Sequence, residues 1–249
     1  MPSARILDCR VDGIGRAGAV EKIVALLGAD EPSYVVTLGT EMIVRAQDDE
    51  RFRALLNGAA LSLCDTVGVM YAARMHNVFI RQPVTGIDLI DPLCEALAVQ
   101  GASIYLLGAA GDTAERAARG LMQRHPDVKI AGWRNGFFSP NEAGAVAASI
   151  AQSGAQVVLA GMGSPRQEYW LGEHLRATGC RVGIGVGGSF DVLAGNVKRA
   201  PALLRRLGFE WFYRLIREPN RWRRQLALPR FLWLVLREGV AGAAKEYRG

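Results

Sequence analysis

The sequence has no long apolar run and no CxxC pair. Its longest candidate for a membrane segment, FLWLVL at 231–236, is far shorter than the roughly 20 residues that span a bilayer. The N-terminal stretch lacks the apolar core of a signal peptide. Three of the four scattered cysteines lie in or beside apolar runs, which favours buried free thiols in a reducing cytoplasm. We therefore expect a protein that is soluble or rests on a membrane surface.

Motifs for several common chemistries are also missing. The three histidines are scattered and form no HExxH pair, so a histidine-based metal site is not expected. The chain has no GxSxG elbow and no Walker loop, and its glycine loop at 106–115 is not a complete GxGxxG. These absences argue against a zinc hydrolase, a serine hydrolase and a P-loop nucleotidase.

Positive charge is concentrated at one end of the chain. Residues 198–249 contain thirteen Lys or Arg and four Asp or Glu, a net charge of +9, whereas the whole chain carries +6 and residues 1–197 carry −3. A local basic patch indicates a local anion: membrane headgroups, a phosphorylated ligand or RNA. The composition also changes there to Arg- and Trp-rich helical pieces. We therefore divide the chain into an α/β domain, residues 1–197, and a basic helical C-terminal appendage, residues 198–249.

From about residue 32, short apolar runs bounded by glycine alternate with longer helical stretches. One helix is expected across 41–59, directly after the first of these runs. The pattern predicts an α/β fold with a Rossmann-like, mostly parallel sheet covered by helices on both faces. Ligands bind such sheets at the carboxyl ends of the strands. The predicted strands are 34–40, 61–65, 103–108, 128–133, 156–163 and 181–187.

Two of the predicted strand ends carry polar side chains. Thr37 opens TLGTEM (37–42), and Asp65 lies in LCDTVG (63–68). Both have an ordinary structural interpretation, because Thr and Asp cap helices well. Asp65 is also placed to deprotonate a hydroxyl group, since partial burial at the rim of the sheet would raise the pKa of its carboxyl towards the working pH. Position alone leaves both interpretations open.

Two further junctions are rich in glycine. In LLGAAGDTAE (106–115), Gly108 would let backbone amides face an anion at a helix N-terminus, although a tight turn explains the same residues. In AGMGSPRQEYW (160–170), a turn and a helix start account for Gly163 and the proline. They account less well for Arg166 and Gln167, and Gln167 would then point back into a cleft.

Taken together, the junctions resemble those of the WecG/TagA/CpsF glycosyltransferases. The resemblance is carried by TLGTEM, LCDTVGV, RQPVTGIDL, IYLLG, LAGMGSPRQE and the long block IGVGGSFDVLAGNVKRAP…LRRLGFEWFYRLIREPNRW, in order from about residue 11 to residue 224. It implies a bacterial enzyme of surface-polysaccharide assembly, cytoplasmic and peripheral on the inner face of the cell membrane. Such an enzyme moves a hexose (N-acetylmannosamine, its uronic acid or glucose) from a UDP-sugar to a polyprenyl-diphosphate-linked acceptor, with inversion.

The resemblance also implies roles for individual residues. Asp65 falls where the family places its base, and Thr37 and Gln167 match polar residues of the same pocket. The VGGSFD segment resembles part of the nucleotide-sugar site, and three appendage arginines match residues that meet the donor diphosphate. The implied substrate-binding set is Gly108, Gly163, Arg166, Gly187, Gly188, Asp191, Arg214, Arg221 and Arg224.

The chain departs from the family pattern at two junctions. The family commonly has Thr-Pro-Asn-Pro-Glu where this chain has TLGTE, so Gly39 replaces an asparagine that would face the pocket. CDTVG replaces Pro-Asp-Gly-hydrophobic-Gly but keeps the aspartate. No DxD motif appears where a metal would bridge the diphosphate, so we expect no metal and no other cofactor.

The basic appendage allows more than one partner. We expect it to act as a lid over UDP and as a contact with the anionic membrane, where each Lys or Arg contributes about 1 kcal/mol. Its aromatic rings suit an interface.

The alternative is a nucleotide- or RNA-binding module; with no RRM, KH or OB pattern, we expect no nucleic-acid partner. An inactive regulator is disfavoured by Asp65. A homo-oligomer stays open, because the appendage could cover a neighbour's pocket. The aromatic residues of the appendage that we expect at the membrane interface are Trp211, Phe212, Tyr213, Trp222, Phe231 and Trp233.

Overall fold

A computed structural model describes residues 1–201, 204, 212, 213, 215 and 226–246. Eight strands form one sheet in the order β1-β2-β4-β3-β8-β7-β5-β6. β1 and β2 form an antiparallel hairpin, and every other neighbouring pair is parallel. The strands are β1 (Ser3–Ile6), β2 (Cys9–Asp12), β3 (Ser33–Leu38), β4 (Leu61–Cys64), β5 (Ser103–Gly108), β6 (Lys129–Arg134), β7 (Val157–Gly161) and β8 (Val182–Gly185).

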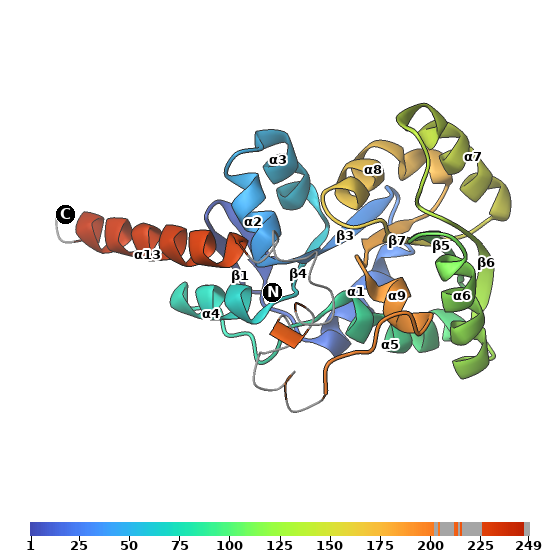
Figure 1. Cartoon of the computed structure of the whole chain (residues 1–249), viewed down its shortest axis with the longest axis horizontal. Helices are drawn as coiled ribbons and strands as arrows, with labels where there is room; N and C mark the ends of the chain where they lie inside the picture. Colours follow the sequence, from blue (N-terminus) through green and yellow to red (C-terminus); the bar gives the residue numbers. More distant parts are fainter. Residues whose placement is uncertain (202–203, 205–211, 214, 216–225, 247–249) are drawn as a thin grey trace.

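Helices cover both faces of this sheet (Figure 1). α1, α5, α6 and α9 pack on one face, and α2, α3, α4, α7, α8 and α13 on the other. The helices are α1 (Arg16–Leu26), α2 (Thr40–Ala46), α3 (Glu50–Gly58), α4 (Val67–Met75), α5 (Gly86–Val99), α6 (Thr113–Arg124), α7 (Ala143–Ser153), α8 (Arg166–His174), α9 (Ser189–Leu193) and α13 (Ala227–Glu246).

The continuous apolar character of the strands follows from this two-sided cover. Successive side chains of a strand point to opposite faces. In β3, Val35 therefore packs with α1 and α5, whereas Val36 packs with α2 and α3, and both are fully buried. The prediction of a Rossmann-like, mostly parallel sheet with helices on both faces is confirmed.

Two local features differ from the expectations. The β1–β2 hairpin and α1 precede the first predicted strand, so the N-terminal region contributes an edge to the sheet. The prediction of one helix over 41–59 is wrong, because the segment forms α2 and α3. Asp49 begins α3 as its N-cap, and its carboxylate accepts a hydrogen bond of 3.0 Å from the Phe52 N–H. An aspartate in this position starts a new helix instead of continuing the old one.

The described part of the appendage packs on the α/β domain through α13. Phe231 and Val235 are buried in the same core cluster as α2 and α4. Phe231 is therefore a core residue rather than an interfacial ring, whereas Trp233 is 57% exposed and Phe212 is 49% exposed. Arg230 forms two hydrogen bonds with Asp48, in the turn between α2 and α3. Trp211 and Trp222 lie outside the described residues.

Candidate active site

Neighbouring strands bring the polar junctions to one rim of the sheet. β4, β3, β8, β7 and β5 are consecutive and parallel, so their carboxyl ends meet at the same edge. At about 4.8 Å between strands, the five ends span about 19 Å. In order along this rim they carry Asp65, Thr37, the pair Gly187 and Gly188, Gln167 just after β7, and Gly108.

The chain leaves β3 and β8 towards opposite faces of the sheet. β3 leads into α2 on one face, and β8 leads into α9 on the other. Open α/β sheets bind their ligands at the carboxyl ends of two parallel strands from which the chain diverges in this way. The buried Thr37 joins the two strands there, because its hydroxyl donates a 2.9 Å hydrogen bond to the carbonyl of Gly185.

Asp65 is not the cap of the helix that follows it. Thr66 is the N-cap of α4, and its hydroxyl accepts a hydrogen bond of 3.4 Å from the Val69 N–H. The backbone N–H of Asp65 donates to the carbonyl of Leu38, which ties the ends of β4 and β3 together. The half-buried Asp65 side chain is therefore not needed for capping, the structural role that the sequence had left open.

Gly39 lies directly beside this carboxylate. A Cβ atom placed on Gly39 would be 4.0 Å from Asp65 Oδ2 and 3.6 Å from the methyl group of Thr66. Its φ of −101° is accessible to any residue. A side chain at position 39 would thus begin in ordinary contact with Asp65 and Thr66. That the family's asparagine faces the pocket stays an expectation.

Gln167 connects the β7 and β8 junctions through its buried amide. Its Oε1 accepts hydrogen bonds from the N–H groups of Gly163, at 3.2 Å, and Gly187, at 3.1 Å. Both glycines have positive φ angles, +79° and +53°, in the left-handed region that favours glycine. The side chain is only 2% exposed, so Gln167 holds the two junctions together at the centre of the rim.

Glu168 is a buried carboxyl that the sequence analysis did not single out. Its Oε1 accepts a 2.7 Å hydrogen bond from the Gln167 amide nitrogen. Burial raises the pKa of Glu168 above its usual range, and the hydrogen bonds from Gln167 and Ser164 offset part of this rise. An acidic residue is ordinary in the first turn of a helix, so the sequence around SPRQE gave no signal that this carboxyl is buried.

Gly108 has a packing reason to be glycine. Its φ is +155°, and a Cβ atom there would lie 2.5 Å from the carbonyl of Gly161. The next residue, Ala109, donates its N–H to the same carbonyl. Close backbone contact between the β5 and β7 ends therefore excludes any side chain at position 108, and its role in binding a substrate stays a prediction.

The remaining described residues of the predicted set make local contacts. The exposed Arg166 donates to the carbonyl of Phe138 at 2.7 Å and stacks 4.8 Å from the centre of its ring. Asp191 accepts a hydrogen bond of 3.3 Å from Asn196, which also contacts Thr113 at the start of α6. Gly188 is the N-cap of α9. The predicted appendage residues Arg214, Arg221 and Arg224 lie outside the described residues.

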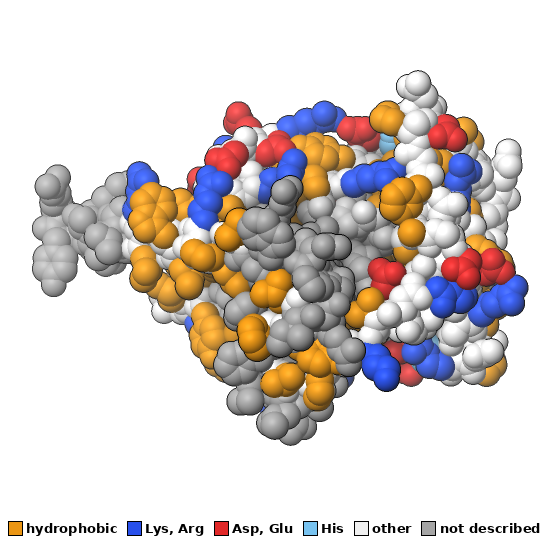
Figure 2. All heavy atoms as spheres, viewed as in Figure 1, with side chains coloured by type: hydrophobic (Ala, Val, Ile, Leu, Met, Phe, Trp, Pro, Cys, Tyr) orange, Lys and Arg blue, Asp and Glu red, His pale blue; other side chains and the backbone are white. Residues whose placement is uncertain are grey.

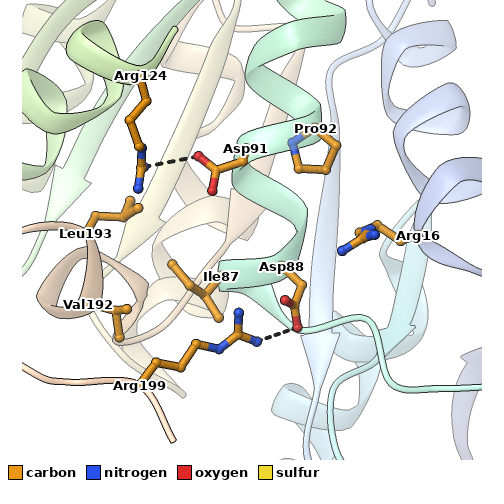
Figure 3. A pocket seen from close by; sticks show the side chains of 9 residues that line it. All are labelled: Arg16, Ile87, Asp88, Asp91, Pro92, Arg124, Val192, Leu193 and Arg199. Atoms are coloured by element: carbon orange, nitrogen blue, oxygen red, sulfur yellow. Dashed lines mark hydrogen bonds and ion pairs between the residues drawn. The ribbon is translucent and has the colours of Figure 1, made fainter. Parts of the chain in front are cut away.

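A pocket of about 270 Å³ is lined by residues of α5, α6 and α9 (Figure 3). Its charged lining is largely paired internally, with Arg199 on Asp88 at 2.6 Å and Arg124 on Asp91 at 3.1 Å. The Asp88 carboxylate also accepts from Thr85, the N-cap of α5. None of Asp65, Thr37 and Gln167 lines this pocket. Its interpretation is structural: the Arg199 pair fastens the start of the appendage to α5.

Comparison of the sequence with known proteins shows the family. The model of the glycosyl transferase WecG/TagA/CpsF family matches residues 4–245. The chain belongs to this family. It is therefore a glycosyltransferase rather than the alternative, a nucleotide- or RNA-binding module.

Two curated relatives carry the name N-acetylglucosaminyldiphosphoundecaprenol N-acetyl-beta-D-mannosaminyltransferase. The Bacillus spizizenii protein is 31% identical over 223 residues, which cover 90% of this chain and 86% of the relative. The Bacillus subtilis protein is 33% identical over 206 residues, covering 83% and 80%. Within the described part of this chain, no helix is long and apolar enough to cross a membrane.

Proposed function

We propose that this glycosyltransferase moves a hexose from a UDP-sugar to a saccharide linked to a polyprenyl diphosphate, with inversion at the anomeric carbon. The observation that carries the proposal is the position of Asp65. A carboxylate that does not cap its helix lies at the rim of the sheet, at the end of β4 and next to the ends of β3 and β8, where the chain diverges to opposite faces. A single base of this kind is what an inverting displacement requires on the acceptor side.

The proposed reaction is one displacement at the sugar. Asp65 accepts the proton of the acceptor hydroxyl, and the hydroxyl oxygen attacks the anomeric carbon. The bond from that carbon to the β-phosphate oxygen breaks on the opposite side, and UDP leaves with the bonding electron pair. The proton remains on Asp65 until solvent removes it. No covalent intermediate with the enzyme forms, so the configuration at the anomeric carbon inverts.

Charge develops on the leaving diphosphate, and the family resemblance assigns its stabilisation to Arg214, Arg221 and Arg224. Guanidinium groups bind phosphate oxygens through paired hydrogen bonds and need no bridging metal. We therefore expect transfer to continue in EDTA at the rate seen with added Mg²⁺ or Mn²⁺. A rate that EDTA abolishes and either metal restores would contradict metal independence.

The donor sugar is the least constrained part of the proposal. The names of both relatives describe an N-acetylmannosaminyl transfer to N-acetylglucosaminyldiphosphoundecaprenol. Among the three hexose types, these names favour N-acetylmannosamine for this chain, while Gly39 next to Asp65 is a reason for a different preference. An acceptor anchored by its lipid in the inner membrane face would place the transfer reaction at that face.

A donor screen tests the proposed function directly. UDP release is measured for UDP-N-acetylmannosamine, its uronic acid and UDP-glucose, each with a short-chain, water-soluble N-acetylglucosaminyl lipid diphosphate. We expect acceptor-dependent release with one of these donors and a product of inverted configuration by proton NMR. Release from none of them, or a product of retained configuration, would contradict the proposal.

A further inference from the structure

α4 and α13 lie side by side and run in the same direction. At the start of α4, Gly68 is next to the ring of Phe231 in α13. Directly after α4, His76 Nε2 lies 3.5 Å from the Glu238 carboxylate. Along each helix the two contacts are about 10 to 12 Å apart at 1.5 Å per residue. Figure 1 shows the same arrangement, with α4 alongside α13.

Large apolar side chains point outward from both helices and from the loop after α4. On α4 and on α13 the exposed residues recur four positions apart, so they form a stripe opposite the buried one. In Figure 2, hydrophobic side chains gather over α13 and the neighbouring α4. The exposed fractions are 58% for Tyr71, 58% for Met75, 74% for Phe79, 58% for Leu232, 57% for Trp233 and 62% for Leu236.

The fold holds Phe79 outward. Its neighbours Val78 and Ile80 are buried, at 6% and 2% exposure, and the ring between them is turned to solvent. Arg74 stacks on this ring at 5.1 Å and on the Tyr71 ring at 5.5 Å. The same guanidinium donates a 2.7 Å hydrogen bond to the carbonyl of Ile80, which fixes the arrangement.

Arginines border this apolar surface. Arg74 and Arg81 flank the loop, and Arg237 stacks 5.4 Å from the ring of Trp233. Among the described residues, no carboxylate pairs with any of these three arginines. Large apolar side chains, a tryptophan and unneutralised arginines are the combination that binds the boundary between acyl chains and anionic headgroups.

We propose that α4, the loop 76–80 and α13 form one membrane-docking surface, called here the α4–α13 surface. Its occupant is an anionic lipid bilayer. Docking therefore does not depend on the appendage alone, because the α/β domain contributes Tyr71, Met75 and Phe79. Tyr71 follows Asp65 by only six residues, so the surface adjoins the candidate active site. This inference rests on the proposed function, whose acceptor is lipid-linked.

Sedimentation of the full-length chain with vesicles tests the surface. The vesicles are phosphatidylcholine with and without phosphatidylglycerol, and the variants are Phe79→Ser and its control Phe137→Ser. Phe137 is also 74% exposed, but it follows β6, five strands away from β4. We expect Phe79→Ser to lower partitioning about tenfold, from the lost burial of one aromatic side chain. Phe137→Ser should bind like the unaltered chain.

A charge variant separates headgroup from acyl-chain binding. Arg81→Gln should lower partitioning about fivefold on vesicles containing phosphatidylglycerol and leave binding to phosphatidylcholine alone unchanged. Equal binding by Phe79→Ser and Phe137→Ser would overturn the proposal, as would failure of the unaltered chain to bind either vesicle. A dimer in sedimentation velocity that Phe79→Ser converts to a monomer would also overturn it, because a second copy would then be the occupant.

The proposed function is tested apart from the surface. Transfer by the unaltered chain to the water-soluble acceptor is measured without vesicles, so its failure contradicts the transferase proposal alone. Loss of vesicle binding by Phe79→Ser with a normal thermal melting curve supports the surface whatever the transfer assay shows.

Discussion

The side-chain oxygen of Gln167 lies 3.1 Å from the backbone nitrogen of Gly187 and so joins the β7 junction to the β8 junction. A second hydrogen bond, from Gly163, reaches the same oxygen. These contacts give Gln167 a definite structural task at the centre of the rim. They also explain why two glycines with positive φ angles keep a single arrangement there.

Gln167→Leu should therefore destabilise the fold. The substitution leaves two backbone N–H groups without their acceptor, and we expect a loss of about 2 kcal/mol in the free energy of unfolding. Urea denaturation measures the loss. Arg166→Leu is the matched control, because this neighbour is exposed and donates only one hydrogen bond to Phe138. Equal losses in the two variants would show that Gln167 does not hold the junctions.

The buried carboxyl of Glu168 should make stability depend on pH. Burial raises its pKa above the ordinary value of 4.5, so the folded chain holds this proton more tightly than the unfolded chain does. The stabilisation from the protonated group is complete below that ordinary value and is lost as the pH rises through the raised pKa.

Glu168→Gln removes the titration while keeping an oxygen that can accept from Gln167. The variant should therefore gain stability relative to the unaltered chain as the pH increases above about 4.5. Urea unfolding of both proteins across this range measures the difference. Parallel stability curves would mean that Glu168 does not titrate with a raised pKa in the folded chain.

Gly39→Asn should fold, because a Cβ atom meets only ordinary contacts there. We expect its free energy of unfolding to stay within about 0.5 kcal/mol of the unaltered chain, as for other changes without a clash. The new amide would lie beside Asp65, so the ratio of turnover among the UDP-sugars should change. A donor panel measured on both proteins tests this expectation.

Gly108→Asn makes the same change, glycine to asparagine, at a position that has no room for a side chain. Its Cβ atom would lie 2.5 Å from the backbone of Gly161, so the ends of β5 and β7 would have to separate. We expect poor folding or a strongly lowered melting temperature. If Gly108→Asn were as stable as Gly39→Asn, the close approach of these strands would be contradicted.

Asp65→Asn should remove chemistry without removing the fold. The loss of a general base lowers turnover by about 100-fold or more, whereas the caps and strand contacts at this junction remain. Thr66→Ala should behave in the opposite way. It loses the α4 cap, at about 1 kcal/mol of stability, and retains most of the turnover. Melting curves and UDP release, measured on both variants, give the comparison. Undiminished transfer by Asp65→Asn would remove the basis of the proposed mechanism.

The strands that carry the site were predictable because their pattern is local. Apolar runs bounded by glycine placed all six predicted strands within a few residues of their observed limits, and SIYLLG coincides with β5. The N-terminal hairpin was not predicted, since short edge strands such as SARI carry little pattern. The break between α2 and α3 was also missed, because apolar spacing continues across Asp49 while the cap stops the helix.

The contacts within the site were not predictable in the same way. Glu168 looks like an ordinary first-turn acid, and only the packing of α8 against β3, β7 and β8 makes it a buried carboxyl. The sequence left Asp65 as either a cap or a base, and the adjacent Thr66 hydroxyl decided which residue caps α4. Phe231 was expected at an interface, but it faces the core because α13 packs on α2.

The amino-acid order alone determines that strands alternate with helices, that polar residues follow those strands, and that the family motifs are present. These properties depend on backbone preferences and on residues a few positions apart. Only the tertiary structure decides the strand order that sets Thr37 against Gly185, the bond from Gln167 to Gly187, and the pairing of α4 with α13. Those contacts join residues far apart in sequence, and their energies exist only after the chain has buried its core.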